Sequence, residues 1–173
     1  MATEIKILDD EKIVHTGIYD FDEFYMHMWR WLEWHKFTTE EKKYAEKKKV
    51  GGEGVESKDL DIQWEGSKDY DEYTKINVKL RFVTFGMKDA EVQRGSAKVK
   101  MQTGEVDVFV SASFTLDKDN KYEKNPGLKF FRHFFERYLY KDTIEQLKSD
   151  TWKFGWDLHN EVKAFLNLYK HTR

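Results

Sequence analysis

Apolar and polar residues alternate along most of residues 58–117, and a period of two is the pattern of β-strands with one buried face. The alternating runs cover residues 60–64, 76–82, 90–92, 97–101 and 106–116. Near Gly95 and Ser96 the alternation changes parity, which we interpret as a β-bulge. Because short polar links join the runs, we expect an antiparallel meander with one solvated face.

The chain before this meander is expected to hold a strand and two helices. The first fifteen residues read as one strand, or as a small hairpin that turns near Asp9. Asp20 followed by Glu23 is a capping-box pattern and predicts the start of a helix. Thr38 and Glu41 repeat this pattern, which predicts a second, short and lysine-rich helix that ends at the next pair of glycines.

Residues 126–140 are the most aromatic segment of the chain, and Pro126 after Asn125 is a favourable helix start. On a helical wheel one half of the circumference holds the apolar side chains, namely Leu128, Phe130, Phe131, Phe134, Phe135, Tyr138 and Leu139. Glu136 lies in the middle of the polar half, which argues against a helix lying on a membrane. The aromatic residues share one face instead of lining a basic groove, which argues against single-stranded nucleic acid. We therefore expect this helix to fill the core.

The last helix is expected to run from Asp142 to about Tyr169, with tryptophans outside its main apolar stripe. Trp152 and Trp156 lie one turn apart on a different face, and His159 lies beside them. Indoles outside the stripe need a second surface to contact: the preceding helix, a partner chain or a ligand. The sequence leaves these three alternatives open and makes this cluster its main candidate site.

His35 is a further candidate site residue, because it falls on the apolar face of the first helix. It is expected to be a hydrogen-bonded core histidine, with a catalytic base as the alternative. His159 to Glu161 match the first half of a zinc-deaminase signature, but the chain has no cysteine to complete it. No phosphate-binding loop or nucleophile elbow occurs, so we expect neither a metal nor a cofactor.

Composition restricts the partners of the chain. The 30 Lys and Arg residues balance 32 Asp and Glu residues, and the net charge of -2 gives no overall attraction to nucleic acid or anionic lipid. The expected solvated face of the meander carries the basic residues Lys75, Lys79, Arg81, Lys98 and Lys100. Strands bearing Asp59, Asp61, Glu65, Glu105 and Asp107 should flank and neutralise them. Without a signal peptide or a long apolar run, the expectation is a cytoplasmic protein with no membrane span.

The element order resembles the helix-grip fold of the START and birch-pollen-allergen-like superfamily. That resemblance implies a curved sheet that wraps the last helix and leaves an apolar cavity between them. Together with the patterns above, it predicts a single α+β domain over residues 1–173. We expect an antiparallel β-meander, a long C-terminal helix and the other helices packed on one face.

The predicted function is a non-catalytic binding or interaction module, with an apolar pocket or a Trp-bearing surface between the sheet and the C-terminal helix. Its partner is expected to be an apolar small molecule or a protein, and the chain is a candidate homo-oligomer. One alternative is a small hydrolase-type or lyase-type enzyme that uses His35 or His159 with a carboxylate in a pocket. Another alternative is a peripheral nucleic-acid-binding protein, although a nucleic acid is the partner that the charge pattern favours least.

Overall fold

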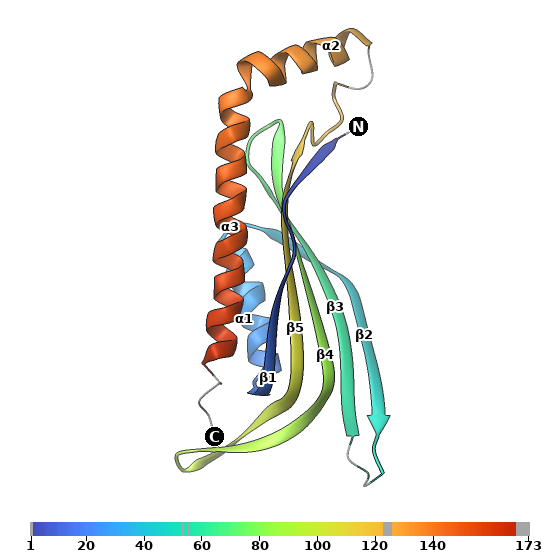
Figure 1. Ribbon diagram of the computed structural model, residues 1–173, viewed down its shortest axis with the longest axis vertical. Coiled ribbons are helices and arrows are strands. Elements are labelled where there is room, and N and C mark those ends of the chain that lie inside the picture. The colour runs from blue at the N-terminus through green and yellow to red at the C-terminus, as the bar shows by residue number, and fades with distance from the viewer. Residues whose placement is uncertain (1, 53, 55, 123–125, 169–173) are drawn as a thin grey trace.

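The computed structural model describes residues 2–52, 54, 56–122 and 126–168, and these form an α+β fold (Figure 1). The strands form one antiparallel sheet in the order β1-β5-β4-β3-β2. Their bounds are β1 Thr3–Tyr19, β2 Thr38–Val50, β3 Glu56–Asp69, β4 Thr74–Arg94 and β5 Ala97–Leu116. The helices are α1 Phe21–Trp34, α2 Pro126–Phe134, a π-helical turn η1 Phe135–Leu139, and α3 Lys141–Asn167. The antiparallel meander and the long C-terminal helix expected from the sequence are confirmed.

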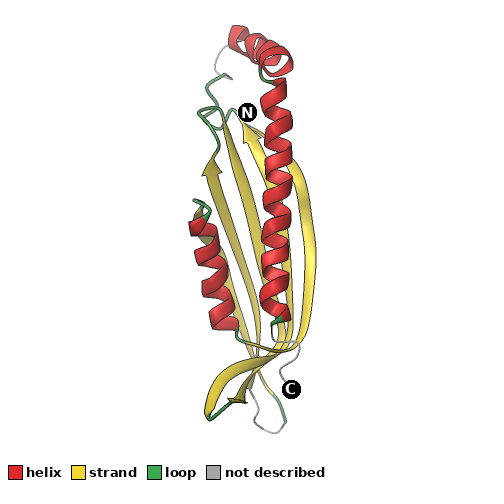
Figure 2. Ribbon diagram, turned by 90° about the vertical axis from the view of Figure 1, so that its left-hand side faces the viewer, coloured by secondary structure: helices red, strands yellow, loops and turns green. Residues whose placement is uncertain are grey.

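One side of the sheet is covered by α1 and α3, which lie side by side in Figure 2. Asp20 caps α1 as predicted, because its Oδ1 accepts a 2.9 Å hydrogen bond from the Glu23 amide. Phe24 of α1 packs edge-on against Phe82 of β4, with 5.6 Å between the ring centroids. It also lies 5.3 Å from the ring of Phe165 on α3, so the two helices and the sheet share one core.

A glycine allows α3 to lie close to the sheet. A Cβ atom at Gly155 would lie 3.0 Å from the Cβ of Ala112 on β5 and 3.3 Å from the methyl groups of Leu8 on β1. Contacts this short require the neighbouring atoms to shift if any larger residue replaces Gly155. The crossing of α3 over β1 and β5 therefore depends on small side chains at both positions.

The lysine-rich helix expected after Thr38 is wrong, because this segment is the edge strand β2. It pairs with β3 along its length, from Thr38 opposite Ser67 to Val50 opposite Glu56. Lys43 and Lys49 form ion pairs with Asp61 and Asp59 of β3. Pairing with β3 has here outweighed the helix propensity of these side chains. Lysines on an edge strand also hinder its pairing with other molecules.

Two turn assignments are settled by the backbone. The first strand is one continuous element with register shifts between Lys6 and Glu11, and Asp10 there has a φ of 52°. The β-bulge predicted near Gly95 is wrong, because the change of parity there marks the turn between β4 and β5. Arg94 pairs with Ala97, which leaves a two-residue turn in which Gly95 has a φ of 62°.

The expectation that residues 126–140 pack into the core is also wrong. Figure 1 shows α2 beyond the end of the sheet, bent away from α3. The side chain of Phe130 is 79% exposed and that of Phe131 is 54% exposed. Of this segment's rings, Phe135 is half-buried and stacks on Tyr140, with 5.2 Å between centroids. The apolar half of this helix thus lies outside the core that α1, α3 and the sheet share.

Candidate functional site

The two tryptophans of α3 lie apart from the core stripe of that helix, as the sequence predicted. Trp152 is 53% exposed, whereas Trp156 is half-buried against the edge of the core. Their ring centroids are 6.2 Å apart with an interplanar angle of 60°. Together with Lys153, Asp157 and Asn160 they line a shallow hollow of about 550 Å³. We call these five residues the Trp surface.

His159 lies beneath the Trp surface. Its ring is 5.0 Å from that of Trp156 in an edge-on arrangement, and the residue is 9% exposed. Within the described part of the chain its Nδ1 atom has no hydrogen-bond partner. A hollow of about 150 Å³ between α3 and β1 is lined by Lys12, His15 and His159, among others. A buried nitrogen without a partner costs stability, so a ligand or solvent molecule that reached it would be held there.

His35 is not part of this cluster. It ends α1, where its Nδ1 atom lies 2.8 Å from the carbonyl oxygen of Trp31. Its ring is 3.8 Å from that of Trp31 and 5.5 Å from that of Phe154 on α3. The hydrogen-bonding contact expected for His35 is present, but the residue is half-buried at the end of α1 and is not the core histidine in the middle of an apolar face that the sequence predicted.

Sequence reasoning missed a histidine–carboxylate pair that joins the two helices. Nε2 of His27 on α1 lies 2.6 Å from Oε1 of Glu161 on α3. The His27 ring packs against Phe165, with 5.0 Å between centroids. His27 and Glu161 are far apart in the chain, so no local sequence pattern could predict their contact. Neither residue lines a hollow described here, and the pair connects α1 to α3 across the surface of the core.

Another hollow lies beside α1 and not between the sheet and α3. Its volume is about 510 Å³, and its apolar lining includes Phe21, Tyr25, Met26, Tyr44, Leu60 and Met87. Charged residues from four strands surround it, such as Lys58 and Lys100. The Tyr25 hydroxyl donates a 2.5 Å hydrogen bond to Glu41, and burial, followed by this bond, raises the pKa of Tyr25 to about 12. A hollow of this size and polarity has the dimensions of a small-molecule site.

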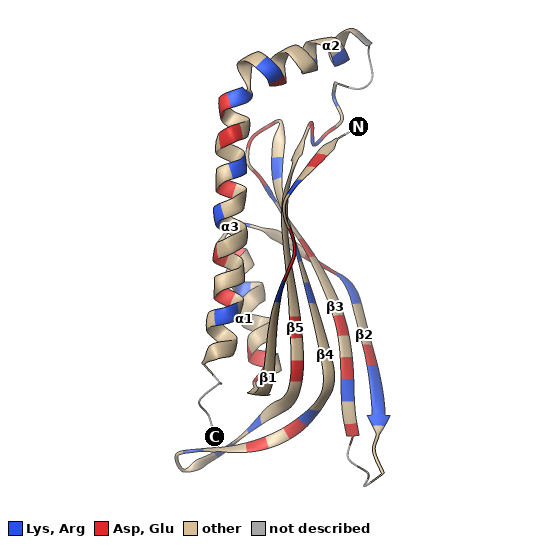
Figure 3. Cartoon of the chain, in the orientation of Figure 1, with Lys and Arg blue, Asp and Glu red and all other residues tan. Residues whose placement is uncertain are grey.

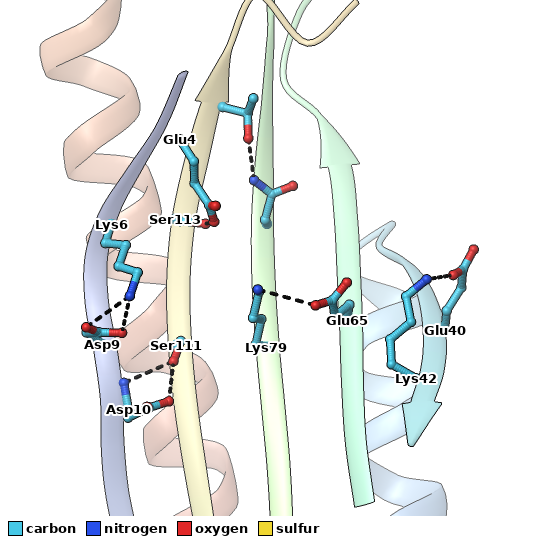
Figure 4. Close-up of polar contacts among 12 residues, drawn as sticks. Glu4, Lys6, Asp9, Asp10, Glu40, Lys42, Glu65, Lys79, Ser111 and Ser113 are labelled. Atoms are coloured by element: carbon cyan, nitrogen blue, oxygen red, sulfur yellow. Dashed lines mark hydrogen bonds and ion pairs between the residues drawn. The ribbon is translucent and has the colours of Figure 1, made fainter. Parts of the chain in front are cut away.

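The side of the sheet that faces away from α1 and α3 is polar, and several of its charges are paired (Figures 3 and 4). Lys79 of β4 lies 3.3 Å from Glu65 of β3. Arg81 donates two hydrogen bonds, of 2.9 and 3.0 Å, to the carboxylate of Asp61, and this contact, with Lys43 nearby, lowers the pKa of Asp61 to about 2. Acidic residues of β3 thus lie beside Lys79 and Arg81 as predicted and largely neutralise these two cations. Asp107 of β5 instead pairs with Lys12 of β1.

No metal-binding group emerges from the described residues, where no cluster of three or more His, Cys, Asp or Glu side chains could hold an ion. Nor does the described part contain a helix long and apolar enough to cross a membrane. Comparisons of the chain with protein-family models, curated proteins and solved structures gave no match. The resemblance to the helix-grip fold therefore rests on element order and stays an expectation.

Proposed function

We propose that this protein is a non-catalytic interaction module that binds another protein chain through the Trp surface of α3. The observation that carries the proposal is the 53% exposure of Trp152 beside the half-buried Trp156. Tryptophan is the residue most enriched among those that dominate binding energy at protein interfaces. Indoles on a long helix packed against a sheet are held rigidly, which lowers the entropic cost of binding.

The surroundings of the two indoles support a protein partner. The hollow between them is shallow, and the adjoining Lys153 and Asp157 carry opposite charges. An apolar centre with a polar rim is the usual arrangement of a protein interface. A small ligand would instead be expected in a concave site that buries most of its surface.

The test replaces both tryptophans with alanine in the full chain and compares the association of variant and wild type by sedimentation and native mass spectrometry. We expect the Trp152→Ala/Trp156→Ala protein to lose an association that the wild type shows, either with itself or with a co-purified chain. The matched control is Trp34→Ala, because Trp34 is 81% exposed at the end of α1 and outside this surface. Equal association of the wild type and the double variant would refute the proposal.

A second candidate function is the binding of an apolar small molecule in the hollow beside α1, and it is supported by the roughly 510 Å³ volume of that hollow. Met26 and Tyr44 line the hollow and are exposed, so they tolerate replacement. Met26→Lys/Tyr44→Lys should release a bound molecule detected by native mass spectrometry without changing the fold. If the same mass stays bound to this variant, the hollow is not its site.

An enzyme remains the third candidate, and its geometric support is weaker. The proposed chemistry needs a histidine and a carboxylate that face a common hollow. His35 is held by Trp31 and Phe154, while His159 lies beneath Trp156. The 2.6 Å pair of His27 and Glu161 has the right chemistry but connects two helices outside the hollows described above.

A further inference from the structure

The segment formed by α2 and η1 is attached to the rest of the protein by the polar side of its helix. Nη2 of Arg132 donates a 2.9 Å hydrogen bond to the Thr3 hydroxyl at the start of β1, and Nε donates one of the same length to Glu136. Glu136 in turn accepts a hydrogen bond from the Tyr73 hydroxyl. The side of the helix that carries Arg132 and Glu136 therefore faces the end of the sheet.

The opposite side of this helix is apolar and faces outward. The exposed large apolar residues away from the side of Arg132 are Phe130, Phe131, Phe134, Tyr138 and Leu139. Phe134 and Tyr138 contact each other, with 4.9 Å between ring centroids, and thus form a continuous aromatic surface. We call these five residues the outer face. Exposed apolar patches rimmed by polar residues mark contact sites for proteins or membranes.

The charges beside the outer face are basic. Between Gly127 and Tyr140 the one acidic residue is Glu136, which is turned toward the sheet and bonded to Arg132. The exposed lysine, arginine and histidine side chains of the same segment are Lys129, His133 and Arg137. The Arg137 guanidinium lies 5.8 Å from the ring centre of Tyr138. From the helical wheel, Glu136 on the polar half argued against binding to a membrane surface. In the structure Glu136 faces the sheet, so it would not meet the membrane.

The position of α2 makes the outer face accessible to a flat surface. Figures 1 and 2 show α2 at one end of the long axis of the molecule, beyond the ends of the strands. Since the contacts with Thr3 and Tyr73 lie on the sheet side, the outer face points away from the body. A planar surface can therefore approach it without meeting the sheet or α3.

We propose that the outer face of α2 and η1 docks on the surface of an anionic lipid bilayer, with the helix lying in the plane of the interface. Phenylalanine, tyrosine and leucine on one side of a helix with lysine and arginine beside them is the composition of interfacial helices. Anionic headgroups complement Lys129 and Arg137. If two outer faces paired symmetrically, their basic residues would repel each other. If the outer face docked on the Trp surface of a second copy, it would find no excess of acidic residues there, because Lys153 lies beside Asp157.

The test is sedimentation of the full-length protein with vesicles of phosphatidylcholine alone and of an equal mixture with phosphatidylglycerol. We expect binding to the mixed vesicles that weakens as salt is added, and much weaker binding to phosphatidylcholine. Lys129→Ala/Arg137→Ala should weaken binding to the mixed vesicles by about thirtyfold. Each cation near an anionic surface contributes about 1 kcal/mol, and about 1.4 kcal/mol corresponds to a tenfold change in affinity. Phe130→Ser/Phe134→Ser should abolish it, and unchanged thermal unfolding would show that this variant is folded.

Trp152→Ala/Trp156→Ala is the matched control and should bind vesicles as the wild type does, because its residues lie on α3 outside the outer face. This control also separates the present proposal from the function proposed for the Trp surface. The proposal is overturned if the wild type binds neither kind of vesicle, or if the serine variant binds as well as the wild type. It is equally overturned if the serine substitutions convert a dimer into a monomer in the absence of lipid, which would identify a second copy as the occupant.

Discussion

Nη1 of Arg132 lies 3.6 Å from Oδ2 of Asp117, and the two side chains are 14% and 1% exposed. Asp117 follows the last residue of β5, and its other oxygen accepts a 2.9 Å hydrogen bond from the Lys121 amide. A buried carboxylate is costly unless a cation lies next to it. Arg132 supplies that cation, and this ion pair helps to hold the side of the helix that carries Arg132 and Glu136 against the end of the sheet.

Removal of Arg132 should therefore destabilise the fold although the residue lies on a peripheral helix. We expect Arg132→Ala to lower the free energy of unfolding by about 3 kcal/mol, because the carboxylate of Asp117 is left buried without its counter-ion. The measurement is denaturant unfolding of both proteins. Arg132→Ala/Asp117→Asn should recover part of the loss, since asparagine carries no charge and tolerates the φ of 52° at this position. A double variant no more stable than the single one would show that the ion pair is not the cause.

The aromatic residues of the outer face should contribute little to stability. Phe130→Ala is expected to change the free energy of unfolding by less than about 0.5 kcal/mol, as exposed positions do. Phe24→Ala, whose ring is 0% exposed and contacts both Phe82 and Phe165, should cost about 3 to 5 kcal/mol. Thermal and denaturant unfolding of the two variants makes the comparison. Similar losses for both would mean that α2 packs on the core in solution.

How far the sequence predicted this structure is clear from α2 and β2. The helical wheel separated the apolar from the polar residues of 126–140, but the direction in which each half points depends on contacts of Arg132 with Asp117 and Thr3, which lie outside the helix. The lysine-rich segment after Thr38 has the composition of a helix, and only its pairing with β3 makes it a strand. The patterns that predicted well were local ones: the alternation of β3 to β5, the Asp20 cap and the stripe of α3. The position of Trp152 and Trp156 outside that stripe was also visible, whereas the pair of His27 and Glu161 was not. The single domain and the helix-grip resemblance stay predictions.

The close approach of α3 to the sheet leads to a prediction at Gly155. Gly155→Val should destabilise the protein by about 1 to 3 kcal/mol, because its first added carbon alone would lie 3.0 Å from Ala112. The valine methyl groups add further volume at this contact. Ala164→Val is a control on the same helix, since Ala164 is exposed. If unfolding of the two valine variants is alike, α3 does not lie as close to β5 as the structure has it.

The ion pair of Asp61 and Arg81, on the solvent-facing side of the sheet, should make the free energy of unfolding depend on pH in the acid range. The Arg81 guanidinium, with Lys43, lowers the pKa of Asp61 from its ordinary value of 3.8 to about 2. The ionised form is thus favoured in the folded state, so its contribution to stability is complete above pH 3.8 and is lost as the pH falls toward 2. We expect the difference in unfolding free energy between the wild type and Asp61→Asn to shrink over that interval. A constant difference between near-neutral pH and the acid end would show that Asp61 is not stabilised by its cations.

The tryptophans supply the last prediction, which compares a core indole with the exposed ones. Trp64 of β3 is 1% exposed, and its ring lies 4.7 Å from Phe82 and 4.6 Å from Tyr25. Trp64→Ala should cost about 3 to 5 kcal/mol, because a cavity remains where these rings met. Trp152→Ala should cost less than about 1 kcal/mol, since half of its side chain already faces water.

This difference matters because it separates binding from folding. If Trp152 were held mainly for stability, its loss would resemble that of Trp64 and would accompany any loss of association. Denaturant unfolding of the two single variants, read beside their sedimentation, distinguishes these cases. A loss of association in a Trp152→Ala protein that unfolds like the wild type assigns the exposed indole to a partner. A loss of stability as large as that of Trp64→Ala would instead make Trp152 a structural residue and remove the basis of the proposed function.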